Sequence, residues 1–521
     1  MPTRNIVKQN RYQDSVTLMQ VAVRLRAMHG VEDASLMMGT EPNREMLAEA
    51  GLLAPEGKVA GPNDLIIALS GTDEALESVE GELETLLRAE IPSSGERAES
   101  APHTLAEGRA ALPGANLALI STPGLYAAAE ARKALLAGMH VMIFSDNVSI
   151  EDEQKLKTLA VERGLLLMGP DCGTAIIGGV PLGFANVVRR GNIGVVGASG
   201  TGMQEVTSLI DRYGGGVSHA IGTGSRDLSE RVGGAMTIMG LSALVEDPST
   251  TVIVLVSKPP HPDIAAKVLD AASRASKPVV AAFLGADRDS LTQGKQHTNI
   301  STAGTLEEAA RRAVELAGGH IPENRVDEDP IAGIKERLAP SQRYVRGLFS
   351  GGTFCYEAML LMQRALGPIY SNTPLSPETA LPDAHKSKSH TCLDMGSDEF
   401  TVGRPHPMID LSARQERILA EAEDPEVAVL LLDIVLGYGS HPAPGIALAQ
   451  TISDAKAHAR SAGRELPVVA SISGTERDPQ GLQEQKRALV EEGVILASSN
   501  ADAARLAAAI ADDGRRSSYV T

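Results

Sequence analysis

The sequence has no tryptophan, and only 3% of its residues are aromatic. Rings that stack on bases or sugars are therefore scarce, which argues against a site built on stacking. The three cysteines, Cys172, Cys355 and Cys392, are widely spaced and form no CxxC pair. This spacing gives no sign of a disulfide framework or of a metal site, and it fits a reducing compartment.

Long apolar runs are also missing. No run reaches the roughly 18–20 residues that cross a bilayer, and the start of the sequence lacks the apolar core of a signal peptide. We therefore expect a cytoplasmic protein without membrane contacts. The formal net charge of -18 leaves no large basic face for nucleic acid, so an anionic substrate must be bound by local donors.

Glycine is abundant, and apolar strand patterns alternate with helical ones. The content of 43% hydrophobic and 22% charged residues is typical of a globular protein. Many of the 51 glycines directly follow apolar runs, where loops form after parallel strands. Such strands separated by helices predict parallel sheets covered on both faces. Ligands are expected beyond the carboxyl ends of the strands.

Two segments rich in proline, glycine or charge are expected to be linkers, Ile91 to Gly114 and Ile321 to Gln342. They separate a small α+β domain over 1–90 from a longer α/β part. The strand and helix repeats of that part predict an α/β protein with three doubly wound parallel-sheet domains, over 115–190, 191–320 and 343–521.

One feature occurs twice. Residues 193–205 and 347–357 each combine a short strand, a turn rich in serine and glycine, a threonine and, four residues later, a glutamate. The first amides of a helix lack intrahelical acceptors, and with the helix dipole they favour a phosphate or carboxylate. Two such starts could face one anion from opposite sides. The predicted phosphate-binding residues are Ser199, Gly200, Thr201, Ser350, Gly352 and Thr353.

Each start taken alone could also be an ordinary Ser/Thr N-cap after a strand, and both interpretations stay open. Neither turn is a Walker A loop, because Gly-Lys-Ser/Thr is absent. Residues 194–202 also lack the acidic partner of a dinucleotide fingerprint. Glu205 and Glu357 lie a full turn inside their helices, so we expect them to brace those helices.

Other loops that follow strands carry further candidates. Cys172, in Gly-Pro-Asp-Cys-Gly-Thr, could be a nucleophile, but a buried structural thiol is favoured because no histidine lies nearby in sequence. Lys258 could neutralise an anion or lie at the surface. Arg477 could clamp a carboxylate or phosphate, or pair with an aspartate in its turn.

The segment 393–410 is dense in functional residue types and poor in regular pattern, which is typical of a site loop. Arg404 and His406 are its best candidates for substrate contact. A metal site using His406 and Asp410 is a weaker alternative. His297 could be phosphorylated or could be an exposed loop histidine.

The stretch 191–205, with Gly169-Pro-Asp-Cys upstream, resembles the α subunit of succinyl-CoA synthetase, and the C-terminal third resembles the ligase domain of its β subunit. The whole chain is identified as a member of the FdrA family. Matching stretches include Phe144-Ser-Asp-Asn-Val, Gly403-Arg-Pro-His-Pro-Met-Ile-Asp and Gly474-Thr-Glu-Arg-Asp-Pro-Gln.

The resemblance implies a CoA-binding-like Rossmann domain over 115–190 and flavodoxin-like ligase domains over 191–320 and 343–521, without an ATP-grasp domain. In the synthetase, the two helix starts point at a phosphohistidine. Its Gly-His-Ala-Gly motif is absent here, where the chain reads Gly294-Lys-Gln-His-Thr-Asn. Its supporting glutamate falls at Lys258. A positive charge in that place suits a free anion better than a phospho-enzyme.

FdrA proteins are named acyl-CoA synthetases by homology. The resemblance also implies a subunit of oxamate carbamoyltransferase, which converts oxalurate and phosphate to oxamate and carbamoyl phosphate in allantoin breakdown. The leading hypothesis is therefore a carbamoyltransferase subunit that acts with other protein subunits. Its substrate is phosphate or carbamoyl phosphate. The reaction requires no covalent enzyme intermediate, no cofactor is assigned, and whether CoA binds stays open. Its catalytic residues, which orient the oxalurate carboxylate, are Arg404, His406 and Arg477.

Two alternatives stay open. The first is an acid–thiol ligase that works with a separate nucleotide-binding subunit, with CoA near Pro123–Ala127 and a phosphorylated His297. The second is a non-catalytic scaffold that keeps the synthetase fold.

Overall fold

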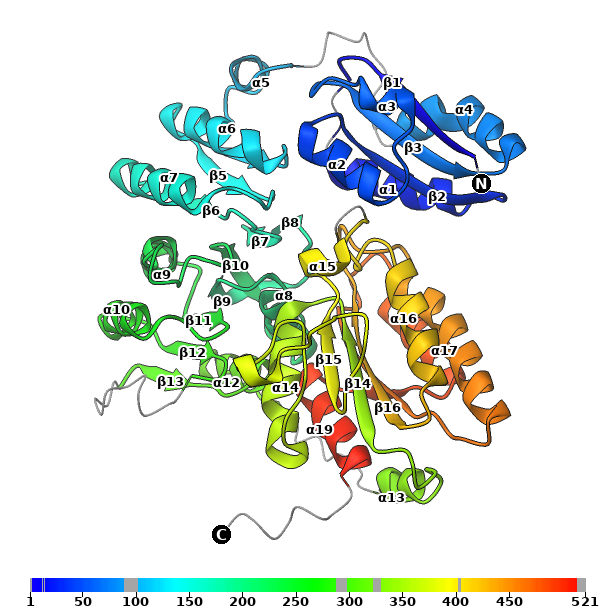
Figure 1. Ribbon diagram of the computed structural model, residues 1–521. Helices are drawn as coiled ribbons and strands as arrows, with labels where there is room; N and C mark the ends of the chain where they lie inside the picture. Colours follow the sequence, from blue (N-terminus) through cyan, green and yellow to red (C-terminus); the bar gives the residue numbers. More distant parts are fainter. Residues whose placement is uncertain are drawn as a thin grey trace. The chain divides into compact units, whose positions relative to one another are not determined.

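The computed structural model describes residues 2–11, 13, 15–88, 102–286, 298–321, 329–401 and 404–512. The chain divides into two compact units, one of Met1–Gly114 with Asp398–Asp410 and one of Ala115–Ser397 with Leu411–Thr521. Parallel strands alternate with helices through the second unit (Figure 1), so the predicted α/β class is confirmed. Among the helices described, none is long and apolar enough to span a membrane.

The first unit contains a three-stranded antiparallel sheet with the order β1-β3-β2. Side chains of the central strand β3 alternate between two faces, as strand geometry requires. Leu65, Ile67 and Leu69 pack into one apolar cluster, and Ile66 and Ala68 pack into another. The strands are β1 (Thr3–Lys8), β2 (Val31–Met38) and β3 (Leu65–Gly71).

The helices of the first unit are α1 (Ser15–Arg26), α2 (Glu41–Glu49), α3 (Pro55–Lys58), α4 (Asp73–Arg88), α5 (Leu105–Ala111) and α15 (Asp398–Thr401). The segment 398–410 belongs to this unit because Arg26 of α1 pairs with both Asp33 and Asp410. The sequence-based limits put this segment in the range 343–521. An ion pair between distant parts of a chain leaves no local sequence signal.

The second unit contains a seven-stranded sheet with the order β13-β12-β11-β9-β10-β7-β8. Five strands run parallel, and a hairpin of β7 and β8 adds antiparallel strands at one edge. The hairpin turn is Gly178-Gly179 with positive φ at both residues, as a two-residue turn favours. The strands are β7 (Thr174–Ile177), β8 (Val180–Gly183), β9 (Arg190–Gly197), β10 (Val217–Gly222), β11 (Val252–Ser257), β12 (Val279–Phe283) and β13 (Ile300–Thr302).

Two smaller parallel sheets complete the second unit. They have the orders β4-β5-β6 and β15-β14-β16-β17-β18. Every residue of β16 and β17 is buried, as expected for strands covered on both faces. The strands are β4 (Leu117–Ile120), β5 (His140–Ile143), β6 (Leu167–Met168), β14 (Tyr344–Phe349), β15 (Thr391–Asp394), β16 (Val427–Val435), β17 (Val468–Ser473) and β18 (Ile495–Ala497).

The α-helices of the second unit follow the strands. They are α6 (Gly124–Leu136), α7 (Ile150–Arg163), α8 (Gly200–Arg212), α9 (Ala235–Glu246), α10 (Pro262–Ser273), α12 (Leu306–Leu316), α13 (Asp329–Lys335), α14 (Gly352–Leu366), α16 (Ser412–Glu423), α17 (Pro444–Ser461), α18 (Leu482–Glu491) and α19 (Asn500–Ala511). Four of them, α8, α12, α14 and α19, pack against one another between the seven-stranded and five-stranded sheets.

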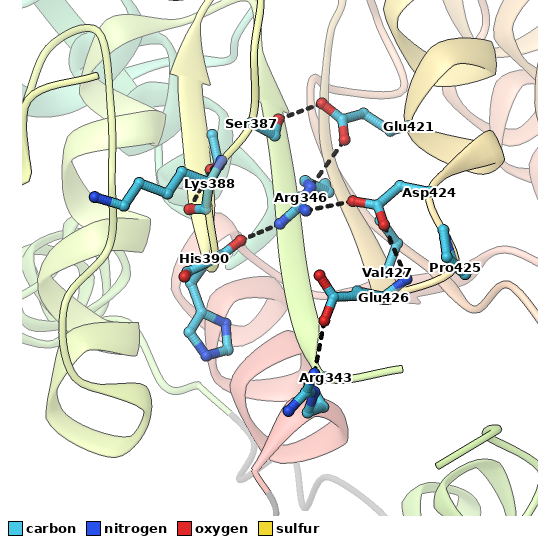
Figure 2. A network of polar contacts seen from close by, with 12 residues as sticks. Arg343, Arg346, Ser387, Lys388, His390, Glu421, Asp424, Pro425, Glu426 and Val427 are labelled. Carbon is cyan, nitrogen blue, oxygen red and sulfur yellow. Dashed lines mark hydrogen bonds and ion pairs between the residues drawn. The ribbon is translucent and has the colours of Figure 1, made fainter. Parts of the chain in front are cut away.

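A buried charge network holds the end of β14 that lies away from its helix (Figure 2). The Arg346 guanidinium donates to Glu421 over 2.8 Å and to Asp424 over 2.6 Å, and it also contacts the Ser389 carbonyl. Arg417 donates to the second oxygen of Glu421. Arg346 and Glu421 are both buried, so their charges need partners. These ion pairs supply the partners and fix this end of the strand.

Candidate functional site

Helix α8 starts directly after β9, and Ser199 is its N-cap. The Ser199 Oγ accepts a hydrogen bond from the Gly202 N–H over 3.0 Å. A Cβ at position 202 would lie 2.4 Å from Ser199 Oγ and 3.2 Å from the Thr353 methyl. Glycine at this position therefore lets the start of α8 approach α14 closely.

Helix α14 starts after β14, and its first turn meets the first turn of α8. The hydroxyls of Ser199 and Thr353 are 2.6 Å apart and hydrogen-bonded, with either able to donate. A Cβ on Gly351 would lie 2.8 Å from the Thr201 methyl. The structure thus brings the two predicted helix starts together, and the expectation that they face each other is confirmed. We call the set Ser199–Thr201 with Gly351–Thr353 the helix-start junction.

Several backbone N–H groups of the junction are free to bind a ligand. Among the described residues, the amides of Gly200, Thr201, Gly352 and Thr353 have no protein acceptor. Amides at a helix start carry partial positive charge that is reinforced by the helix dipole. Donors of this kind from two helices can bind a small oxyanion without arginine.

One cation lies at the junction. The Lys258 ammonium, just after β11, is 3.3 Å from the position that a Cβ on Gly352 would take. In the part of the chain that the structure describes, this ammonium forms no ion pair within 4.0 Å. It lies 6.0 Å from the centre of the Tyr356 ring. Of the two interpretations of Lys258, the structure therefore favours the anion-neutralising one.

The carboxylate of Asp394, at the end of β15, lies beside Gly352 on the same side of the junction as Lys258. Its Oδ2 is 2.4 Å from the Cβ position of Gly352, so only glycine fits there. Burial raises the pKa of Asp394, and the charge of Lys258 opposes that rise. A carboxyl that gains a proton easily reduces the repulsion that it would exert on an anion.

Ser350 does not have the role that the sequence predicted. Its N–H and its hydroxyl donate to the two carboxylate oxygens of Asp433, each over 2.8 Å, and the Gly351 N–H donates to Asp433 over 3.0 Å. Arg414 adds a further donor at 2.9 Å. The anion that these donors bind is Asp433 of β16, so we assign Ser350 to fixing the start of α14.

Glu205 and Glu357 do not brace their own helices. They hold the first amides of two neighbouring helices instead. Glu205 accepts from the Asn500 N–H at the start of α19 over 3.0 Å. Glu357 accepts from the Leu306 N–H at the start of α12 and from the Asn500 side chain, both over 2.7 Å. Both carboxyls are buried, so they link four helices beneath the junction.

The Glu357 carboxyl makes the stability of this bundle depend on pH. Burial raises its pKa from 4.5 to about 7, although the bonds from Asn500 and Leu306 oppose the rise. The folded form therefore binds a proton that the unfolded form loses. We expect the free energy of unfolding to fall as pH rises from about 4.5 to about 7, by roughly 3 kcal/mol from this group.

Glu357→Gln should flatten that fall, as measured by urea unfolding at several pH values. The control is Glu315→Gln, because Glu315 is exposed in the last turn of α12. An unchanged pH dependence in Glu357→Gln would show that the carboxyl is ionised throughout.

Arg477 lies away from the junction. Its guanidinium is 3.9 Å from Asp211, near the C-terminal end of α8, and its side chain is about half exposed. The junction lies at the other end of that helix, roughly 15 Å along the axis at 1.5 Å per residue. Arg477 therefore does not contact an anion held by Ser199. The aspartate near it is Asp211 of α8, and not one in its own turn as the alternative interpretation expected.

Arg404 and His406 belong to the first compact unit, and the junction belongs to the second. The His406 Nδ1 accepts from the Met408 N–H over 3.2 Å, and Arg404 is exposed. Their predicted contact with substrate stays a prediction. Asp410 pairs with Arg26, so its carboxylate is already matched by a cation. His297 lies outside the described residues.

The cysteines are structural. The Cys172 thiol is buried, donates toward the carbonyls of Thr174 and Gly222, and has its pKa raised to about 12 by burial. Burial also raises the pKa of Cys355 and Cys392. A thiol that resists ionisation is a poor nucleophile, so the favoured interpretation of Cys172 is supported.

Sequence reasoning missed Asp394 and Asp433 at the junction. Both stand at or near the end of a parallel strand, β15 and β16. That position was the available signal, because such strand ends meet at one edge of a sheet. Asp394 and Asp433 reach the junction because β15 and β16 are the neighbours of β14. The order of strands in a sheet cannot be predicted from the local sequence pattern.

Family models match three parts of the chain. A CoA-ligase model matches residues 348–510, and a CoA binding domain model matches residues 188–285. The second match begins where the sequence-based range of 115–190 for that domain ends. A model described as AllF, heavy metal-associated domain, matches residues 1–103. Together with the α/β fold, these matches show a chain that contains a CoA binding domain and a CoA-ligase domain.

The chain belongs to the same family as the uncharacterized protein YahF of Escherichia coli K12. The two are 47% identical over 511 residues, which cover 97% of this chain and 98% of YahF. The α subunit of a succinate–CoA ligase from Aquifex aeolicus is 27% identical over 223 residues, 40% of this chain and 70% of the relative. Subunit alpha 2 of such a ligase from Archaeoglobus fulgidus is 29% identical over 148 residues, covering 28% of this chain and 50% of that subunit.

Among solved structures, one match is the dinucleotide-forming acetyl-coenzyme A synthetase 1 of Ca. Korarchaeum cryptofilum, with a TM-score of 0.32 and 18% identity. The similarity covers 76% of this chain and 82% of that one.

The first unit does not fit a heavy-metal site. Soft metals favour thiolate ligands, and residues 1–114 contain no cysteine. Among the described residues, no cluster of three histidine, cysteine, aspartate or glutamate side chains could hold a metal ion.

Proposed function

We propose that this protein is an acyl-transferring subunit of the acid–thiol ligase type, and that the helix-start junction binds the phosphoryl group of an acyl phosphate. The hydrogen bond between Ser199 and Thr353 carries the proposal, because it joins the free amides of two helices around one position. The Lys258 ammonium supplies the positive charge beside it. The CoA-ligase and CoA binding domain matches support this reaction class.

Chemically, the junction suits transfer of an acyl group between a phosphate oxygen and a second nucleophile. Fixed amides and one ammonium can hold the phosphate and balance the negative charge that develops as the acyl carbon is attacked. In an acid–thiol ligase the second nucleophile is the thiol of CoA. Activation by a nucleotide would then come from a separate subunit.

Carbamoyl transfer is the second candidate, and the placement of Lys258 favours it. In succinyl-CoA synthetase a glutamate at the position of Lys258 supports the phosphohistidine. A cation at this position suits a bound free phosphate better. In this reaction phosphate attacks the carbamoyl carbon of oxalurate and releases oxamate, with partner subunits that supply the rest of the site.

The first test is phosphate binding by the full chain, measured by calorimetry. We expect Thr353→Val to weaken binding about 10- to 100-fold, because a charged ligand loses one hydroxyl donor while the shape is kept. The matched control is Thr207→Val in α8. That buried hydroxyl bonds to its own helix at Met203 and does not face the junction. Equal affinity in wild type and Thr353→Val would argue for a scaffold.

The second test separates the two reactions. The purified protein with its partner subunits is incubated with acyl-CoA and phosphate, or with oxalurate and phosphate, and acyl phosphate is measured. Product from acyl-CoA alone supports the ligase, and product from oxalurate alone supports the carbamoyltransferase. Phosphate binding without either product would overturn both reactions.

A further inference from the structure

Asp171 is a carboxylate outside the helix-start junction. It lies in the loop between β6 and β7, and its N–H donates to the Ser145 carbonyl over 3.0 Å. Its φ of 56° is in the left-handed region, which aspartate adopts more readily than most non-glycine residues.

The Asp171 side chain is held at one oxygen and open at the other. Ser225, after β10, donates its hydroxyl to Asp171 Oδ2 over 2.6 Å. The residue keeps contact with solvent. The crowded surroundings and the negative charge of Asp146 raise the pKa of Asp171 to about 6. Ser225 opposes that rise, as do the positive charges of Arg226 and Lys258.

The loop that carries Asp171 reaches the helix-start junction. Thr174, three residues later, has its Oγ1 3.3 Å from the Cβ position of Gly200. The positive charge of Lys258, whose ammonium lies beside Gly352, also opposes the rise in the pKa of Asp171. The loop of Asp171 therefore borders the junction through Thr174.

We propose that Asp171 is the acid–base residue of the acyl transfer, a step that rests on the proposed function. A phosphate oxygen forms the new bond to the acyl carbon, and the bond from that carbon to the leaving nitrogen or sulfur breaks. The electron pair goes to the leaving atom, which takes the proton of the Asp171 carboxyl. In the reverse direction the Asp171 carboxylate accepts the N–H or S–H proton. No other reactant is needed.

The test is Asp171→Asn in the full complex, with whichever acyl donor the wild type uses. We expect the rate of acyl phosphate formation to fall about 100-fold or more, the usual contribution of general acid–base catalysis. The wild-type rate should also show a pH dependence near pH 6 that Asp171→Asn lacks. Phosphate affinity and the unfolding transition should stay unchanged, which separates a lost proton transfer from a damaged fold.

The control is Asp146→Asn, which removes a neighbouring negative charge and keeps the acid–base group. We expect it to retain most of the rate and to move the pH dependence to lower pH, since Asp146 raises the pKa of Asp171.

The outcomes are distinct. If Asp171→Asn binds phosphate and keeps both the rate and the pH profile, this assignment is wrong and the proposed function stands. If the wild type binds no phosphate, or transfers no acyl group, the proposed function fails and the assignment fails with it.

Discussion

Arg414→Met should lower the free energy of unfolding by about 3–5 kcal/mol, the usual cost of removing one partner from a buried ion pair. Arg414 and Asp433 are both about 1% exposed. The Arg414 guanidinium donates to Asp433 Oδ1 over 2.9 Å and to the carbonyls of Leu348 and Asp433, each over 2.8 Å. Methionine fills much of the volume of the arginine side chain. The loss of stability therefore comes from the Asp433 carboxylate, left without its cation, and from the two carbonyls, left without a donor.

Urea denaturation followed by circular dichroism measures this loss. The control is Arg343→Met, which breaks the exposed pair with Glu426 and should cost less than about 1 kcal/mol. Similar losses in the two variants would mean that Asp433 is satisfied without Arg414. Because Asp433 also binds Ser350 and Gly351, we further expect Arg414→Met to weaken phosphate binding.

Lys258→Met should reduce phosphate affinity about 10- to 100-fold, because the junction would keep its amides and lose its cation. An ammonium about 4 Å from an anion contributes roughly 4 kcal/mol at an effective dielectric constant of 20, and exposure to solvent reduces that value. The binding should also depend less on salt concentration in the variant, since screening acts mainly on the charged pair.

Calorimetry at two salt concentrations measures both effects. Lys267→Met in α10 is the matched control, because Lys267 is exposed and lies outside the junction. Lys258→Arg should keep most of the affinity, since the charge is retained. If Lys258→Met binds phosphate as tightly as the wild type, the ammonium faces another partner and the anion site has to be placed elsewhere.

The sequence alone determined the class of fold and the existence of the two helix starts. Apolar strands such as 252–256 and 468–471 are buried along their whole length because helices cover both faces. The glycine-rich turns at 197–202 and 350–352 predicted helix N-termini, because the start of a helix depends mainly on residues close together in the sequence. The hairpin of β7 and β8 was missed, although Gly178-Gly179 between two apolar runs indicates it.

Tertiary structure alone decided which side chains meet. Ser350 turned from a ligand candidate into a partner of Asp433, and Glu205 and Glu357 turned from helix braces into acceptors for neighbouring helices. Arg477 came to lie at the far end of α8 from Ser199. Each outcome depends on the order of strands in a sheet and on contacts between residues far apart in the chain. The periodicity of apolar residues indicates which residues are buried. It does not indicate which distant side chain each buried residue contacts.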